Sequence, residues 1–126
     1  MQGATDVAGV DRRLVGARAE SAAAQVLAAR GYRIVARNVR LRWGELDLVC
    51  RDGDALVFCE VKARRPSDLG VAEEALTRAK RLRLARLAAA YLALIGRRDA
   101  PHRIELVAVR LDDAHRPVDI RVVPCG

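Results

Sequence analysis

Residues 44–62, GELDLVCRDGDALVFCEVK, decide the fold, because two mostly apolar runs flank the turn sequence Arg51-Asp52-Gly53-Asp54. An Asp-Gly pair between two such runs is a strong short-range signal for a β-hairpin. We therefore predict antiparallel strands at residues 45–51 and 55–63, joined by a two-residue turn at Asp52 and Gly53.

The predicted turn fixes which side chains share a face of the hairpin. Asp47 would face Phe58, and Glu45 would face Glu60. Because side chains alternate along a strand, one face is predicted to carry the charged residues Glu45, Asp47, Glu60 and Lys62. The other face is predicted to be apolar and to cover the core with Leu46, Leu48, Val57, Cys59 and Val61.

Three carboxylates beside one lysine require compensation, because like charges on facing strand positions repel each other. Raised pKa values, salt bridges or a bound cation would each relieve the repulsion. Carboxylates with water form the preferred environment of Mg²⁺ or Mn²⁺. The ordinary alternative is a solvated polar face. Glu60 favours the metal site, because it lies in an otherwise apolar run where an unpaired carboxylate is costly to bury.

The stretch before the hairpin predicts a helix from about Asp11 to Arg30, since it is rich in alanine, lacks proline and is followed by Gly31. Residues 1–10 show no periodicity and are expected to form a flexible tail. At 100° per residue, Glu20 lies at the margin of the apolar side of this helix. That side is formed by Val15, Ala19, Ala22, Ala23, Val26 and Leu27.

A second helix is predicted at residues 72–95, with an apolar stripe that contains Lys80. The stripe consists of Leu76, Leu84, Leu87, Tyr91, Leu94 and Ile95. A lysine on a buried face is unusual. Its ammonium group either extends along the helix to solvent or reaches an acidic site or a phosphate.

Three further strands are predicted at residues 32–37, 102–111 and 118–123. The resulting order, α-β-β-β-α-β-β, is typical of an α/β domain with a mixed sheet flanked by helices. The 126 residues suit one domain, which we place at residues 11–126.

Lysine and arginine total 23 against 16 acidic residues, a net charge of +7. Such a basic domain favours a polyanionic partner such as nucleic acid, although an arginine-rich composition bias would give the same charge. The three cysteines have no zinc-site spacing, and Cys50 and Cys59 are expected to be buried. No signal peptide or apolar run of membrane-spanning length is present. We therefore expect a cytoplasmic protein without a membrane partner.

The pattern of Asp47 followed by Glu60-Val61-Lys62 resembles the D…(E/D)-x-K signature of the restriction-endonuclease-like, or PD-(D/E)xK, superfamily. The whole chain from about Val15 to Val123 resembles the YraN-like family of bacterial proteins. The shared segments include residues 16–20, Asn38, residues 44–47, residues 58–64, Lys80, Tyr91 and residues 103–105. That family is in turn similar to Holliday-junction resolvases.

The resemblance implies a restriction-endonuclease-like fold and assigns a role to each matching residue. Asp47 and Glu60, with the main-chain carbonyl of Val61, would hold a divalent metal, Mg²⁺ or Mn²⁺. Lys62 would orient or help to deprotonate the attacking water. Glu20 would complete the catalytic set, while Glu45 and Lys80 would lie in the outer shell or contact a phosphate.

The function implied is metal-dependent hydrolysis of phosphodiester bonds in DNA, on branched or damaged substrates, by a two-fold homodimer. The alternatives are a nucleic-acid-binding module that keeps the fold without the chemistry, and a scaffold protein. One departure from the family pattern is Glu105, where an aspartate is usual. It would matter if Glu105 contacts the site.

Overall fold

The computed structural model describes residues 3–65 and 77–125. Its elements follow the predicted α-β-β-β-α-β-β order, with two helices flanking one sheet. They are α1 (Gly3–Ala29), β1 (Arg33–Leu41), β2 (Gly44–Asp52), β3 (Ala55–Arg64), α3 (Arg78–Leu94), β4 (His102–Leu111) and β5 (Pro117–Pro124). The α/β class and the mixed sheet are therefore confirmed.

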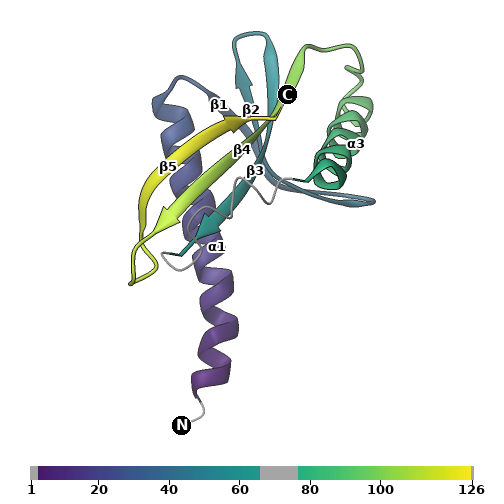
Figure 1. Ribbon diagram of the computed structural model, residues 1–126. Coiled ribbons are helices and arrows are strands. Elements are labelled where there is room, and N and C mark those ends of the chain that lie inside the picture. The colour runs from purple at the N-terminus through teal and green to yellow at the C-terminus, as the bar shows by residue number, and fades with distance from the viewer. Residues whose placement is uncertain (1–2, 66–76, 126) are drawn as a thin grey trace.

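The five strands lie side by side in chain order, β1-β2-β3-β4-β5 (Figure 1). The β3–β4 pair is parallel and the other three pairs are antiparallel. A parallel pair requires a crossover connection, and the chain between β3 and β4 contains α3. This crossover brings α3 against the sheet beside β2.

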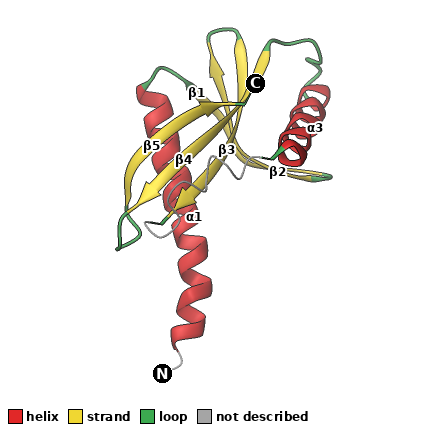
Figure 2. Ribbon diagram, in the orientation of Figure 1, coloured by secondary structure: helices red, strands yellow, loops and turns green. Residues whose placement is uncertain are grey.

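The two helices bury opposite faces of the sheet (Figure 2). On one face, Ala19, Ala23 and Leu27 of α1 pack with apolar side chains that include Cys50 and Cys59. On the other face, a second cluster joins α3 to Val49 and Phe58 and consists of Leu46, Val49, Leu56, Phe58, Leu84, Leu87, Ala88, Tyr91 and Leu92. The predicted burial of Cys50 and Cys59 is thus confirmed.

The first helix starts earlier than the sequence predicts. It begins at Gly3 rather than near Asp11, and the intervening segment contains no proline that would stop it. Its predicted apolar side is largely confirmed, because Ala19, Ala23 and Leu27 are buried. Flexibility of residues 1–10 stays a prediction.

The second long helix starts later than predicted. Thr77 has an extended backbone and caps α3 by accepting a hydrogen bond from the Lys80 N–H, so no single helix runs from residue 72 to residue 95. The first residues of that prediction, including Leu76, lie outside the described residues. Leu94 and Ile95 are exposed, so their place in the buried stripe was wrong, and Leu92 is buried instead.

The hairpin between β2 and β3 has a different register from the predicted one. Asp52 pairs with Ala55, so the two turn residues are Gly53 and Asp54. Gly53 has a positive φ of 61°, which glycine adopts without steric cost. As a result Val49, not Asp47, faces Phe58. The shift of two residues leaves the alternation of faces along β3 unchanged.

Candidate active site

The candidate site lies where β2 separates from β3. Regular pairing of the two strands ends at Leu48 and Cys59. The next step of the same register sets Asp47 opposite Glu60. Here the Asp47 carboxylate replaces a backbone acceptor, because its Oδ2 accepts a hydrogen bond of 2.8 Å from the Val61 N–H. A side chain thus continues the ladder and holds Asp47 beside β3.

The alternation of β2 breaks at Asp47. Leu46 belongs to the apolar cluster under α3, whereas Leu48 belongs to the cluster under α1. The prediction that both leucines share one face is therefore wrong. The β1 position opposite Asp47 is Asn38, whose φ of 51° is left-handed. Both strands of the β1–β2 hairpin are irregular at this point.

Glu60 is almost completely buried, with 7% of its surface exposed, and lies on the α3 face of the sheet. The Lys62 Nζ is 3.9 Å from the Glu60 Oε2. The Arg83 guanidinium of α3 is 3.6 Å from the same oxygen. A buried carboxylate requires such cationic partners, so Glu60 and Lys62 are brought together as the sequence predicts.

Arg83 is the residue that the sequence analysis missed. Lys80, for which the sequence left open either extension to solvent or contact with the site or a phosphate, is half-buried, and its backbone N–H donates a hydrogen bond to the Thr77 hydroxyl. Arg83 follows three residues later, about one helical turn further along α3. The missed signal was its three-residue spacing from Lys80, which places both side chains on neighbouring parts of one helix surface.

Glu20 and Glu45 border the site from the other side. The pKa of Glu20 is raised mainly by burial and then by the negative charge of Glu45. A hydrogen bond from the Asn38 side chain and the charge of Arg37 oppose that increase. Glu45 itself is exposed. Asn38 therefore links the irregular point of β1 to the acid contributed by α1.

Asp47 carries the clearest electrostatic perturbation among these acids. Burial raises its pKa to about 6, with further increases from the charges of Glu60, Glu20 and Glu45. The hydrogen bond from the Val61 N–H acts in the opposite direction. The negative charges of the other three predicted acids therefore all act on Asp47.

The donor chemistry suits a divalent cation with a mainly aqueous coordination shell. Among residues 3–65 and 77–125, no three His, Cys, Asp or Glu side chains are grouped closely enough to hold a metal ion together. Magnesium, however, is commonly bound by one or two carboxylates and keeps several waters. Asp47, Glu60 and the Val61 carbonyl fit that limited role, since they supply only oxygen donors.

Glu105 belongs to a separate network. Its carboxylate accepts hydrogen bonds from the Tyr32 hydroxyl at 3.0 Å and from the Arg103 Nε at 3.0 Å. Arg103 also binds Asp52 at the hairpin turn. These bonds join β4 to the α1–β1 junction and to the β2–β3 turn. Glu105, which departs from the family pattern, is therefore bonded to Tyr32 and Arg103 rather than to the residues of the candidate site.

The model of the uncharacterised protein family UPF0102 matches residues 19–109. The chain belongs to the UPF0102 family. It is 55% identical to a UPF0102 protein of Symbiobacterium thermophilum over 77% of this chain and 82% of that protein. It is also 44% identical to a UPF0102 protein of Nocardia farcinica over 94% of both chains. The resemblance to YraN-like proteins is thus confirmed.

The UPF0102 match includes every candidate residue from Glu20 to Arg83. Within the described part of this UPF0102 chain, no helix has the length and apolar character needed to cross a bilayer.

Proposed function

We propose that this UPF0102 protein is a metal-dependent endonuclease that hydrolyses phosphodiester bonds in DNA. The observation that carries the proposal is the position of Glu60. It is a buried carboxylate next to Asp47, and its Oε2 lies 3.9 Å from Lys62 and 3.6 Å from Arg83. Acids of this kind bind a hydrated cation, and the adjacent cations attract phosphate.

Each side chain of the site has a definable task. Asp47 and Glu60, with the Val61 carbonyl, would hold Mg²⁺ or Mn²⁺, which lowers the pKa of bound water and neutralises charge on the phosphoryl oxygens. Lys62 is close enough to the site to position a water molecule or to stabilise negative charge developing on the phosphate. Arg83 would contact the same phosphate from α3.

The partner proposed is DNA, because the chain has a net charge of +7 while four of its 16 acidic residues, Glu20, Glu45, Asp47 and Glu60, gather at one site. Displacement of counterions from DNA by lysine and arginine would provide affinity. The Asp47–Glu60 site would then be the place where the DNA backbone meets the metal. Glu20 and Glu45 would act through their charges on Asp47.

The test is a cleavage assay on branched, single-stranded and blunt duplex DNA with Mg²⁺ or Mn²⁺. The wild-type protein is expected to cut at least one substrate in a metal-dependent manner. Glu60→Gln and Lys62→Met should each lower the rate by about 10²–10³-fold. Asp54→Asn, a change of an exposed turn residue in the same hairpin, should cut at the wild-type rate.

The second candidate is a DNA-binding module without hydrolytic activity. It is favoured by the lack, among the described residues, of any three-acid cluster that could hold a metal. This function predicts DNA binding that is independent of metal and survives Glu60→Gln. No metal-dependent cleavage, together with unchanged binding by that variant, would replace the nuclease proposal with this one.

A homodimer is part of the proposal only for substrates that need two symmetric cuts. Sedimentation of the protein with and without branched DNA tests this point. A stoichiometry of one chain per junction would exclude paired cleavage by a dimer.

A further inference from the structure

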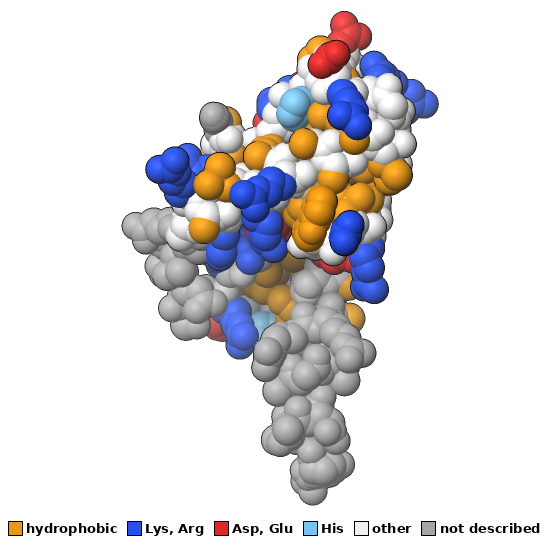
Figure 3. All heavy atoms as spheres, turned by 90° about the vertical axis from the view of Figure 1, so that its right-hand side faces the viewer, with side chains coloured by type: hydrophobic (Ala, Val, Ile, Leu, Met, Phe, Trp, Pro, Cys, Tyr) orange, Lys and Arg blue, Asp and Glu red, His pale blue; other side chains and the backbone are white. Residues whose placement is uncertain are grey.

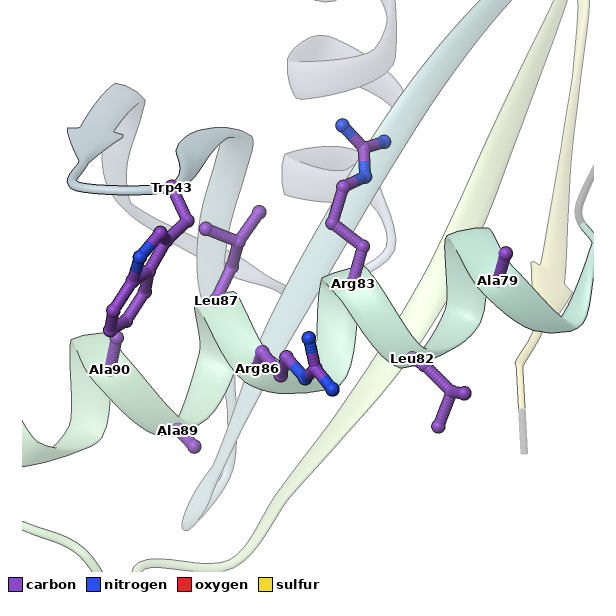
Figure 4. Close-up of a pocket in the computed structure, with 8 residues that line it drawn as sticks. All are labelled: Trp43, Ala79, Leu82, Arg83, Arg86, Leu87, Ala89 and Ala90. Carbon is purple, nitrogen blue, oxygen red and sulfur yellow. The ribbon is translucent and has the colours of Figure 1, made fainter.

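A groove of about 960 Å³ lies on the solvent side of α3, next to the candidate active site. Trp43, from the turn between β1 and β2, forms one end, and Ala79 and Leu82 form the other (Figure 4). The remaining lining residues are Arg83, Arg86, Leu87, Ala89 and Ala90. From Ala79 to Ala90, the groove follows α3 for about three turns.

The groove exposes large apolar side chains that the core does not use. Trp43 is 66% exposed and Leu82 is 51% exposed. On the face that carries α3, apolar side chains lie among lysines and arginines (Figure 3). Exposed aromatic and apolar surface next to positive charge is suited to a partner that is both anionic and ring-bearing.

The local backbone holds Trp43 over α3. Gly44, the next residue, has a positive φ, and an added Cβ would lie 3.3 Å from the Leu87 Cδ1. The close approach of Gly44 to Leu87 therefore brings the β1–β2 turn onto the helix. The Arg42 guanidinium lies over the indole ring at 5.7 Å from its centroid. One face of the indole is thus already covered by a cation.

Arg83 connects the groove to the acidic site. It lines the groove, and its guanidinium lies 3.6 Å from the Glu60 Oε2. In Figure 4 the Arg83 side chain points away from Leu82 and toward the strands, whereas Arg86 lies along the helix. A chain bound in the groove would therefore pass its backbone toward Glu60.

The positive charge of the groove lining indicates which class of molecule would bind there. Among the residues that the structure describes, those that line the groove include two arginines and no acid. A second copy that docked the same face symmetrically would bring these arginines and Arg42 against their own equivalents, which is unfavourable. Unpaired nucleotides instead provide phosphates for the arginines and base rings for Trp43 and the apolar floor.

We infer that this groove binds a short unpaired segment of nucleic acid, with a base stacked on Trp43, and directs the adjoining phosphate to the Asp47–Glu60 site. The inference rests on the proposed function and narrows its substrate class to DNA with single-stranded or flapped segments. It also assigns Arg83 to both binding and positioning.

Trp43 is the sole tryptophan of the chain, so emission excited selectively at tryptophan, where the two tyrosines do not absorb, reports on this groove alone. In EDTA, a short oligothymidylate should quench the emission, whereas inorganic polyphosphate, which has charge but no bases, should not. Trp43→Ala should weaken binding of a labelled oligothymidylate about 10-fold, while Trp43→Phe should bind within about twofold of wild type. Val35→Ala, a matched change of an exposed apolar residue outside the groove, should have no effect.

Equal quenching by polyphosphate, or wild-type affinity in Trp43→Ala, would overturn the inference. So would a self-association that Trp43→Ala abolishes while oligothymidylate affinity is unchanged, since a second copy would then occupy the groove. These measurements need no metal or hydrolysis. Metal-dependent cleavage without stacking on Trp43 would therefore overturn only the claim that the groove binds unpaired nucleic acid. Stacking on Trp43 without cleavage would overturn only the proposed nuclease function.

Discussion

Asp47 is held among like charges by a hydrogen bond that its carboxylate accepts from the Val61 N–H. Its position is also set by the end of regular β2–β3 pairing at Leu48 and Cys59. Burial and the charges of Glu60, Glu20 and Glu45 raise its pKa to about 6. Ionised at neutral pH, this aspartate is expected to weaken the fold. Such a cost is typical of a side chain retained for a ligand.

The pH dependence of stability follows from that shift. A carboxyl whose pKa rises on folding stabilises the protein while protonated, and this contribution is lost as pH rises from about 4 through about 6. In EDTA, Asp47→Asn should therefore match the wild-type melting temperature near pH 4, exceed it increasingly up to about pH 6, and keep a constant advantage from there to pH 8. Thermal unfolding across that range checks the prediction. A difference that does not vary with pH would contradict it.

At the scale of elements, the β1–β2 hairpin is the feature that assembles the site. Its two strands are irregular at Asn38 and Asp47, so Leu46 turns toward α3 while Leu48 stays under α1. The same irregularity sets Asn38 beside Glu20. The hairpin thereby joins acids from α1 and β3.

Asn38 should be sensitive to replacement in a graded way. Alanine loses the Glu20 hydrogen bond and must also adopt the left-handed conformation at a cost of about 1–2 kcal/mol. Glycine loses the hydrogen bond alone. We expect Asn38→Ala to be less stable in urea than Asn38→Gly, and both to be less stable than wild type. Equal losses would show that backbone conformation at residue 38 is unimportant.

Strand positions were predictable because the apolar runs and the Asp-Gly turn define β2 and β3 almost to the residue. The face of the sheet on which each β2 side chain lies was not predictable, because the alternation of side chains fails at Asp47 and the sequence pattern does not reveal that break. Thr77 explains the error at α3, because a capping threonine inside an apolar helical pattern was overlooked. Arg83 was missed because its spacing from Lys80 shows only that the two cations are neighbours on α3, and the folded structure is needed to show which of them meets Glu60.

At the scale of the whole molecule, α1 and α3 cover opposite faces of the sheet, and the site lies where the β2–β3 pair separates between them. On the α3 side, Lys62 and Arg83 lie close to Glu60, Arg86 lines the adjoining groove, and Arg42 lies over Trp43 at the end of that groove. In this arrangement the outer cations can attract a polyanion while the carboxylates of Asp47 and Glu60 attract a metal cation.

This charge pattern predicts salt-sensitive DNA binding. If these four cations contact about four phosphates, affinity for single-stranded DNA should fall roughly 50-fold when the salt concentration rises fourfold. Fluorescence anisotropy with labelled DNA in EDTA measures the slope. Arg86→Ala should reduce the slope by about one contact, with the exposed Arg98→Ala as a control. An affinity that is independent of salt would argue against phosphate recognition.

The most direct test of the central claim is a titration of Mn²⁺ into the protein, followed by the loss of the free-ion electron paramagnetic resonance signal. We predict one bound ion per chain, weakened at least about 10-fold by Asp47→Asn or Glu60→Gln and unchanged by Asp54→Asn. Failure of the wild-type protein to bind Mn²⁺, or equal binding by all four proteins, would contradict the assignment of Asp47 and Glu60 as a metal site.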